Sequence, residues 1–231
     1  MFNFEEGEVI LVDKPLEWTS FDVVKKLKFP IQRVSGKKKI KLGHAGTLDP
    51  LASGLLVLCS GKKTKGIPAI QEAEKEYTGE IFLGATTASY DLESEPENFK
   101  AIDHLVAEDL KLAAAKLTGA IMQRPPLFSA KKVDGTRAYK LARKGSDMQL
   151  EAKAVVIHAF ELTKIDLPIV AFRIRCSKGT YIRSIAHDFG AELGVGGYLS
   201  SLRRTAIGDY QVTDAKGIEE WIALIGQADT N

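Results

Sequence analysis

The stretch "KLGHAGTLDPLASGLLVLCSG", residues 41–61, joins a polar, glycine-rich loop to an unbroken apolar run. Glycines in the loop allow tight turns and close approach of a ligand, and Pro50 pushes the backbone of Asp49 toward an extended conformation. The run "GLLVLCSG", residues 54–61, is typical of a strand that is buried on both faces of a sheet. A carboxylate held beside such a strand suits covalent or electrostatic catalysis at a sugar carbon, although a turn aspartate has the same spacing.

Outward from this stretch, strands and helices mix without regular βαβ alternation, which favours an α+β fold. "EVILVDKP" (8–15) is typical of a buried strand, and Thr19 with Asp22 forms a capping-box pattern at the start of a helix. "KEYTGEIFLG" (75–84) alternates like a strand. Helices are also predicted over 103–118, 136–144, 179–194 and 216–226, and strands over 170–177 and near 205–212. We find no repeat or linker, so residues 1–231 are expected to form a single domain.

Charge is segregated along the chain although the net charge is only +2. Residues 23–48 contain eight Lys or Arg and no acid, and residues 124–144 contain seven Lys or Arg against Asp134 alone. Residues 89–110 are the reverse, with seven acids against Lys100. A basic face of this kind could follow a phosphate backbone, and a solvated lysine-rich surface explains it equally well.

The cysteines and the N-terminus predict a soluble cytoplasmic protein. Cys59 and Cys176 stand alone in apolar runs, which argues against a zinc ribbon or a disulfide framework and fits a reducing compartment. The N-terminal residues carry acids where a signal peptide would carry positive charge. No segment is apolar for long enough to span a membrane.

Several common catalytic motifs are missing. The spacing of Gly54, Gly61 and Lys63 does not fit a phosphate-binding P-loop, and no G-x-S-x-G nucleophile motif occurs. The histidines at 44, 104, 158 and 187 are scattered along the chain rather than grouped as metal ligands. We therefore predict neither a nucleotide cofactor nor a metal.

Taken together, six segments resemble the motifs of the TruB family of tRNA pseudouridine synthases. The longest is "GHAGTLDPLASGLLVLCSGKKTK" (43–65), which is similar to the catalytic motif of that family. The others are "VDKP" (12–15), "KEY" (75–77), "RPPLFSAKKVDGTRAYKLARKG" (124–145), "CSKGTYIRSIAHDFGAELG" (176–194) and "LRRTAIG" (202–208). They occur in family order over nearly the whole chain, so the combined match is far more specific than any one motif.

The resemblance implies a mixed, largely antiparallel sheet flanked by helices, with a basic RNA-gripping segment inserted at about 124–153. It also implies isomerisation of the T-arm uridine, position 55 of tRNA, to pseudouridine without cofactor or metal. Asp49 would be the catalytic carboxylate, kept ionised by Arg183, which lies just off the apolar stripe of its predicted helix. Tyr77 would stack on the target base and help to move the C5 proton, although packing would also explain its position.

Further residues are assigned binding roles by the same resemblance. His44 would fill the space that the flipped base leaves, and Tyr181 with Leu202 would contact the uracil. Lys14 would support the catalytic loop. Phosphates of the T stem would be held by the basic side chains of the inserted segment, namely Lys131, Lys132, Arg137 and Arg143.

The chain departs from many family members in its length. We expect it to lack the C-terminal RNA-binding domain of the PUA type, and to act as a monomer without guide RNA or membrane. The alternative function is an RNA-binding or tRNA-folding protein that does not depend on catalysis. Asp49 and Arg183 together favour the enzyme, because binding alone needs neither of them.

Overall fold

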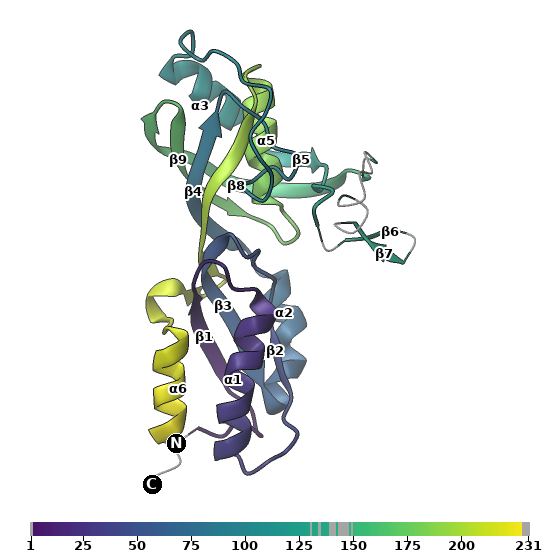
Figure 1. The fold of residues 1–231 in the computed structure, drawn as a ribbon, viewed down its shortest axis with the longest axis vertical. Coiled ribbons are helices and arrows are strands. Elements are labelled where there is room, and N and C mark those ends of the chain that lie inside the picture. The colour runs from purple at the N-terminus through teal and green to yellow at the C-terminus, as the bar shows by residue number, and fades with distance from the viewer. Residues whose placement is uncertain are drawn as a thin grey trace. The chain divides into compact units, whose positions relative to one another are not determined.

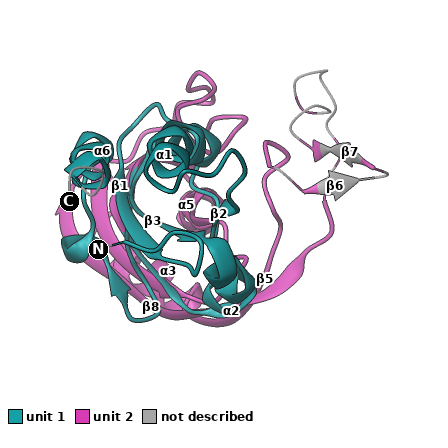
Figure 2. Cartoon of the chain, turned by 90° about the horizontal axis from the view of Figure 1, so that it is seen from below, with its two compact units in different colours: residues 1–77, 202–231 teal, residues 78–201 magenta. Residues whose placement is uncertain are grey.

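The structure is a computed structural model. It describes residues 2–129, 131–133, 135–138, 142, 148 and 150–227, and for 132, 133, 136 and 137 the backbone alone. The chain divides into two compact units, the first made of residues 1–77 with 202–231 and the second of residues 78–201 (Figure 2). Two long strands run from one unit into the other, β4 (Lys75–Leu83) and β10 (Gly197–Ile207). The expectation of a single catalytic domain stays a prediction.

The first unit is built around β3 (Ala52–Ser60), the predicted apolar strand (Figure 1). This strand pairs with β1 (Val9–Lys14) and β2 (Leu42–His44) in antiparallel fashion, and with residues 202–204 of β10 in parallel fashion. Leu56 and Leu58 pack into one apolar cluster while Leu55 and Val57 pack into another. The prediction of a strand buried on both faces is therefore confirmed.

Helices cover both faces of the pair formed by β1 and β3. On one face lie α1 (Ser20–Val34) and α6 (Ile218–Gln227), and Ile67 and Ile70 of η1–α2 (Gly61–Gly66, Ile67–Glu72) pack on the other. The predicted capping box is present, because the Asp22 amide donates to Thr19 Oγ1 at 3.0 Å and the Thr19 amide donates to Asp22 Oδ2 at 3.0 Å. The Thr19 hydroxyl also lowers the pKa of the Asp22 carboxyl. The short strand β11 (Tyr210–Gln211) and η2 (Val212–Asp214) complete the unit.

The second unit has the strand order β10-β4-β9-β8-β5. In it, β8 (Lys153–Asp166) pairs in antiparallel fashion with both β9 (Ile169–Cys176) and β5 (Gly119–Gln123). Alternate residues of β9 are buried, as its pattern predicts. In the same unit the ring centroids of Phe160 and Phe189 lie 5.4 Å apart. The helices of this unit include α3 (Ala107–Lys116) and α5 (Ile182–Glu192).

The strands and helices thus make the mixed, largely antiparallel α+β fold that was predicted, and several elements differ locally from their predicted bounds, among them α5, which spans Ile182–Glu192 rather than 179–194. Helix α3 is shorter than the predicted 103–118, and the last long strand begins at Gly197 rather than near 205. Thr136–Arg137 form β7, paired with β6 (Lys132–Val133) around Gly135, so the helix predicted over 136–144 is wrong at these two residues. The glycine turn favours a hairpin there. Most of residues 139–144 lie outside the described part of the chain.

Within the described residues no cluster of three His, Cys, Asp or Glu side chains is arranged to hold a metal ion. No described helix combines the length and the apolar character that a membrane crossing requires.

Candidate active site

Asp49 lies in the loop between β2 and β3, and its neighbours on both sides are anchored. The Leu48 amide donates to Ser20 Oγ at 2.8 Å, and the Glu17 amide donates to the Pro50 carbonyl at 2.8 Å. Ser20 is the first residue of α1 and Glu17 lies just before the helix, so the start of α1 and the segment that leads into it hold the loop. Asp49 itself is half-buried, and its carbonyl accepts from the Ala52 amide at 3.1 Å. These hydrogen bonds fix the backbone of the segment that carries the Asp49 carboxylate.

A second anchor is Arg204 of β10, which is buried at 1% exposure. Its Nε donates to the Leu55 carbonyl at 2.8 Å, and its terminal nitrogens donate to the Gly46 carbonyl at 3.1 Å and the Thr47 carbonyl at 3.4 Å. One guanidinium therefore ties the loop to the strand that follows it. Charge-assisted hydrogen bonds of this kind are among the stronger ones. Sequence reasoning missed Arg204, because the carbonyls that it meets lie about 150 residues away in the sequence.

Gly54 makes this arrangement possible because β3 and β10 approach closely there. Its φ is +100°, and a Cβ on it would lie 2.3 Å from the Arg204 carbonyl oxygen and 2.9 Å from the Arg204 amide nitrogen. Real Cβ atoms do not come this close to backbone atoms, so the position requires glycine for both its conformation and its space.

We predict that Gly54→Ala lowers the free energy of unfolding by about 3 kcal/mol or more, through backbone strain and overlap together. Gly119 is a matched control, because its φ is +97° but nothing lies within 4 Å of a Cβ placed there. Gly119→Ala should cost only the strain, about 1–2 kcal/mol. Urea unfolding of both variants measures the difference, and equal losses would contradict the close approach described at Gly54.

Lys14, at the end of β1, is fully buried and supports the same region. Its ammonium group donates to the Pro15 carbonyl at 2.9 Å and the Trp18 carbonyl at 2.7 Å, which lie between β1 and α1. Burial lowers the pKa of Lys14 from 10.5 to about 8, while the negative charge of Asp49 opposes this shift and Arg204 adds to it. The lysine is therefore mostly charged at neutral pH, in the same unit as Asp49.

This lowered pKa predicts a pH-dependent stability. Between about pH 8 and 10.5 the unfolded chain holds the Lys14 proton more tightly than the folded chain does. Stability therefore rises with pH in this window, and Lys14 should add about 2 kcal/mol between about pH 7.5 and pH 10. Urea unfolding of wild type and Lys14→Met across this range isolates the effect, because other titrating groups cancel in the difference. A difference that does not change with pH would rule out the shift.

The first unit also contains three of the predicted base-contacting residues. His44 ends β2 and is half-buried, and burial chiefly lowers the pKa of its imidazole, with Arg204 adding to this and a Gly46 backbone contact opposing it. Its Nδ1 is buried and has no hydrogen-bond partner among the described residues. Leu202 pairs in register with Ala52, which follows Asp49 by three residues. Tyr77 is half-buried on β4.

The second unit contains Arg183, in the first turn of α5, and holds it rigidly. Its guanidinium donates to the Ser89 carbonyl at 3.2 Å and the Phe128 carbonyl at 2.9 Å, and lies 3.4 Å from the Asp91 carboxylate. Arg183 is buried at 5% exposure, although it lies just off the apolar stripe of its helix. The reason is polar rather than apolar packing: carbonyls and a carboxylate surround it.

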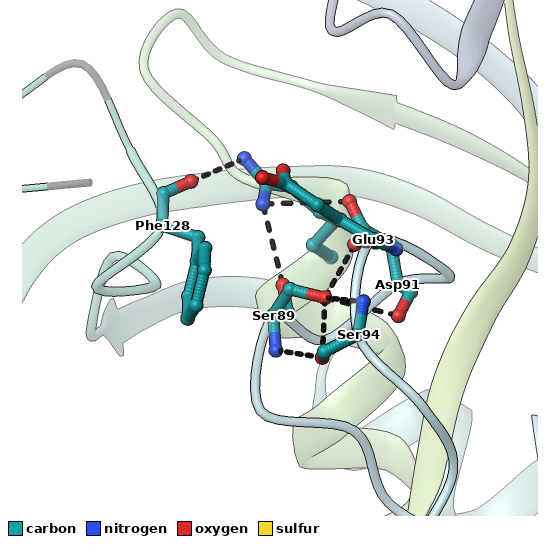
Figure 3. A network of polar contacts seen from close by, with 6 residues as sticks. Ser89, Asp91, Glu93, Ser94 and Phe128 are labelled. Carbon is teal, nitrogen blue, oxygen red and sulfur yellow. Dashed lines mark hydrogen bonds and ion pairs between the residues drawn. The ribbon is translucent and has the colours of Figure 1, made fainter. Parts of the chain in front are cut away.

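Asp91 is the second residue that sequence reasoning missed, because it was counted only as one of the seven acids of the segment 89–110. It is 6% exposed, and its Oδ1 accepts from Ser89 Oγ at 2.6 Å and from the Glu93 amide at 2.9 Å. Figure 3 shows this network, in which Ser94 also meets Ser89. These bonds hold the carboxylate in the orientation that faces Arg183. Its burial and its contact with Arg183 distinguish it from its exposed acidic neighbours, and neither is visible in the local sequence.

The remaining predicted residues are placed unevenly. The Tyr181 backbone is clamped by the buried Gln123 amide, which accepts from the Tyr181 amide at 2.8 Å and donates to its carbonyl at 3.1 Å. Lys131 is partly buried, with its ammonium 3.5 Å from the Glu151 carbonyl. For Lys132 and Arg137 only the backbone, in β6 and β7, is described, and Arg143 lies outside the described residues. Their phosphate contacts, and a pairing of Asp49 with Arg183 of the other unit, stay predictions.

Comparison with known proteins identifies relatives over almost the whole chain. The model of a family described as "TruB family pseudouridylate synthase (N terminal domain)" matches residues 32–182. The tRNA pseudouridine synthase B of Phocaeicola vulgatus is 50% identical over 223 residues, which cover 95% of each chain. That of Flavobacterium johnsoniae is 51% identical over 214 residues, 92% of this chain and 93% of the relative.

Chains from two solved assemblies have a similar fold. A chain of a Cbf5-Nop10-Gar1 complex matches with a TM-score of 0.68 and 31% identity over 90% of this chain. A chain of an H/ACA RNP bound to a substrate RNA containing 2'-deoxyuridine matches with a TM-score of 0.69 and 26% identity over 95% of this chain. The present chain spans about half the length of these two solved chains, 50% and 53%.

Proposed function

The chain belongs to the TruB family of pseudouridylate synthases, and from this premise we propose that it isomerises the T-arm uridine of tRNA, position 55, to pseudouridine. The reaction breaks the bond between ribose C1′ and base N1, turns the uracil, and joins C1′ to C5. The C5 proton leaves and N1 gains a proton, so atoms and electrons balance without an oxidant, a reductant or a nucleotide cofactor.

Asp49 is the carboxylate that acts at C1′ in this proposal. Carbon C1′ becomes electron-poor as the bond to N1 breaks, and a carboxylate meets that charge by covalent attack or by electrostatic stabilisation. The single observation that carries the proposal is the anchoring of Asp49, because Leu48 is bonded to Ser20 at the start of α1 and Pro50 is bonded to Glu17 just before that helix. Catalysis by charge stabilisation depends on a group that does not need to reorganise.

Arg183 is proposed to stabilise the charge of the Asp49 carboxylate in the closed complex with RNA, where the carboxylate loses contact with water. Support comes from the two carbonyls and the Asp91 carboxylate that hold its guanidinium in one place. A fixed guanidinium can meet a carboxylate without the entropic cost of ordering a free arginine side chain.

The target uridine must leave the base stack of the RNA before its C1′ can react at Asp49. We propose that Tyr77, Tyr181 and Leu202 contact the flipped base. His44 fills the space that the base leaves. The lowered pKa of His44 supports a neutral ring at physiological pH, which suits filling space rather than binding phosphate. The half-buried Tyr77 ring suits stacking on the base.

Transfer RNA is the proposed partner, bound by shape and phosphate contacts without guide RNA. Basic residues that follow the start of α1 support this, because they are exposed and no acid interrupts them before Asp49: Lys25, Lys26, Lys28, Arg33, Lys37, Lys38, Lys39 and Lys41. The relatives named tRNA pseudouridine synthase B, which the chain matches over most of their length, support action on tRNA. We further propose a monomer that works in the cytoplasm, to which its buried free cysteines are suited.

Mapping the modified position tests this proposal. An unmodified tRNA transcript is incubated with the protein, and pseudouridine is located by carbodiimide labelling and primer extension. We expect one modified uridine, in the T loop. A transcript with cytidine at that position is the matched control and should stay unmodified. Modification confined to another arm would contradict the proposed specificity.

A further inference from the structure

We propose that Tyr90 and His187 form a stacked pair that positions Asp91, and through Asp91 the Arg183 guanidinium, for the isomerisation. The inference rests on the proposed function and adds to it two residues that do not themselves meet the uridine. They are positioning residues, whose effect on the reaction passes through the carboxylate and the arginine.

The stack and the ion pair link the same two segments. Tyr90 directly precedes Asp91, and His187 follows Arg183 by four residues on α5. Residues with this spacing lie on one face of a helix, one turn apart. The ring centroids of Tyr90 and His187 are 3.9 Å apart, and the angle between the ring planes is 14°. Two adjacent residues of the loop therefore meet two successive turns of α5, one by stacking and one by charge.

The backbone at Tyr90 is strained and held. Its φ is +65°, in the left-handed region that a bulky residue rarely adopts and that costs about 1–2 kcal/mol. The Tyr90 amide donates to the Thr87 carbonyl at 3.2 Å, and its carbonyl accepts from the Leu199 amide at 2.9 Å. Strain of this kind persists only where surrounding contacts over-determine the conformation. The ring stack on His187 is one such contact, and it acts at the residue that sets the direction of Asp91.

The charge state of the pair suits this role. Burial lowers the pKa of His187, so the imidazole is neutral at physiological pH, and its buried Nδ1 meets no hydrogen-bond partner in the described part of the chain. Burial chiefly raises the pKa of the Tyr90 hydroxyl, the charge of Asp188 adds to this, and Arg124 opposes it. Burial raises the pKa of Asp188 to about 6. A neutral imidazole does not compete with Arg183 for the Asp91 carboxylate, as an imidazolium would.

The ring and the backbone conformation of Tyr90 can be tested separately. Tyr90→Phe keeps the ring and loses only the hydroxyl. Tyr90→Ala loses the ring and keeps the left-handed strain, whereas Tyr90→Gly loses the ring and relieves the strain. On the other side of the stack, His187→Phe keeps an aromatic ring and His187→Ala removes it.

The measurement is the single-turnover rate of isomerisation of a T-arm stem-loop RNA at saturating enzyme, with RNA affinity and melting temperature recorded for each variant. We expect Tyr90→Phe and His187→Phe to stay within about threefold of wild type. Tyr90→Ala, Tyr90→Gly and His187→Ala should each lose about 10- to 100-fold in rate, as displaced catalytic groups do, with little change in RNA affinity. In an Asp91→Asn background, Tyr90→Ala should cause no further loss, because its effect passes through Asp91.

Three outcomes would overturn the inference while wild type remains active. One is a normal rate in Tyr90→Gly, which would mean that only the backbone conformation matters. Another is a loss that follows melting temperature across all variants, including the two that keep a ring. The third is a full, additive loss from Tyr90→Ala in the Asp91→Asn background. An inactive wild type would instead refute the proposed function, and the inference would fall with it.

Discussion

Replacement of Asp49 by asparagine is expected to slow uridine isomerisation by at least about 10³-fold, the scale on which removal of a central catalytic group acts. Asparagine keeps the size of the side chain and removes its charge, so the positive charge that develops at C1′ is no longer met. The backbone anchors of the loop run through Leu48 and Pro50 and are untouched by the change. RNA affinity and melting temperature should therefore stay close to those of wild type. Tritium release from RNA labelled at uridine C5 measures the rate.

The same variant separates catalysis from the alternative of an RNA-folding protein, because assistance with folding needs no carboxylate. Asp13 offers a matched control, since it is an aspartate of the same unit whose carboxylate accepts from Arg203 at 2.7 Å and 2.9 Å. Asp13→Asn should retain most of the activity. Tritium release by Asp49→Asn within about tenfold of wild type would remove Asp49 from the centre of the reaction.

Replacement of Arg204 by methionine is the second large effect we expect. Methionine fills part of the space but cannot donate hydrogen bonds, so the carbonyls of Leu55, Gly46 and Thr47 lose a buried partner. At about 1–3 kcal/mol for each unpaired group, the free energy of unfolding should fall by about 3 kcal/mol or more. The rate should also fall by about 10- to 100-fold under conditions where the protein stays folded, because the loop that carries Asp49 is released.

Arg203 is the natural control for this experiment because it neighbours Arg204 on the same strand and carries the same charge. Arg203 forms an ion pair with Asp13 at 2.7 Å, in which the Arg203 side chain is 40% exposed and the Asp13 side chain is 34% exposed. Pairs of that kind contribute about 0–1 kcal/mol, so Arg203→Met should change stability little. Comparable losses in the two variants would mean that the buried carbonyl contacts of Arg204 are not what holds the loop.

Much of the fold could be predicted from local sequence because local rules and the final packing agree. The apolar run of β3 is buried on both faces, and the capping box at Thr19 begins α1 where predicted. The alternation in β9 likewise matches its burial. The errors fall where a tertiary partner or a turn decides. Gly197 begins β10 well before the apolar pattern suggests, and the turn at Gly135 replaces the first residues of a predicted helix by a hairpin.

The residues of the candidate site likewise fall into those that the sequence predicts and those that it does not. Asp49 could be found from its loop, and the roles of Arg183 and Tyr77 came from the resemblance of ordered motifs. Arg204 and Asp91 were missed because their importance comes from burial and from partners distant in sequence. Leu55 is 149 residues from Arg204, and no local pattern reveals such a pairing. Asp91 lies among acids that are exposed, and only its contact with Arg183 sets it apart.

Tritium release from a T-arm stem-loop RNA labelled at uridine C5, incubated with the wild-type protein alone, tests the proposed isomerisation most directly. We expect release that approaches one equivalent per RNA, with no added cofactor, metal or guide RNA, because the isomerisation displaces the C5 hydrogen. Absence of release from the stem-loop and from whole tRNA alike would contradict it.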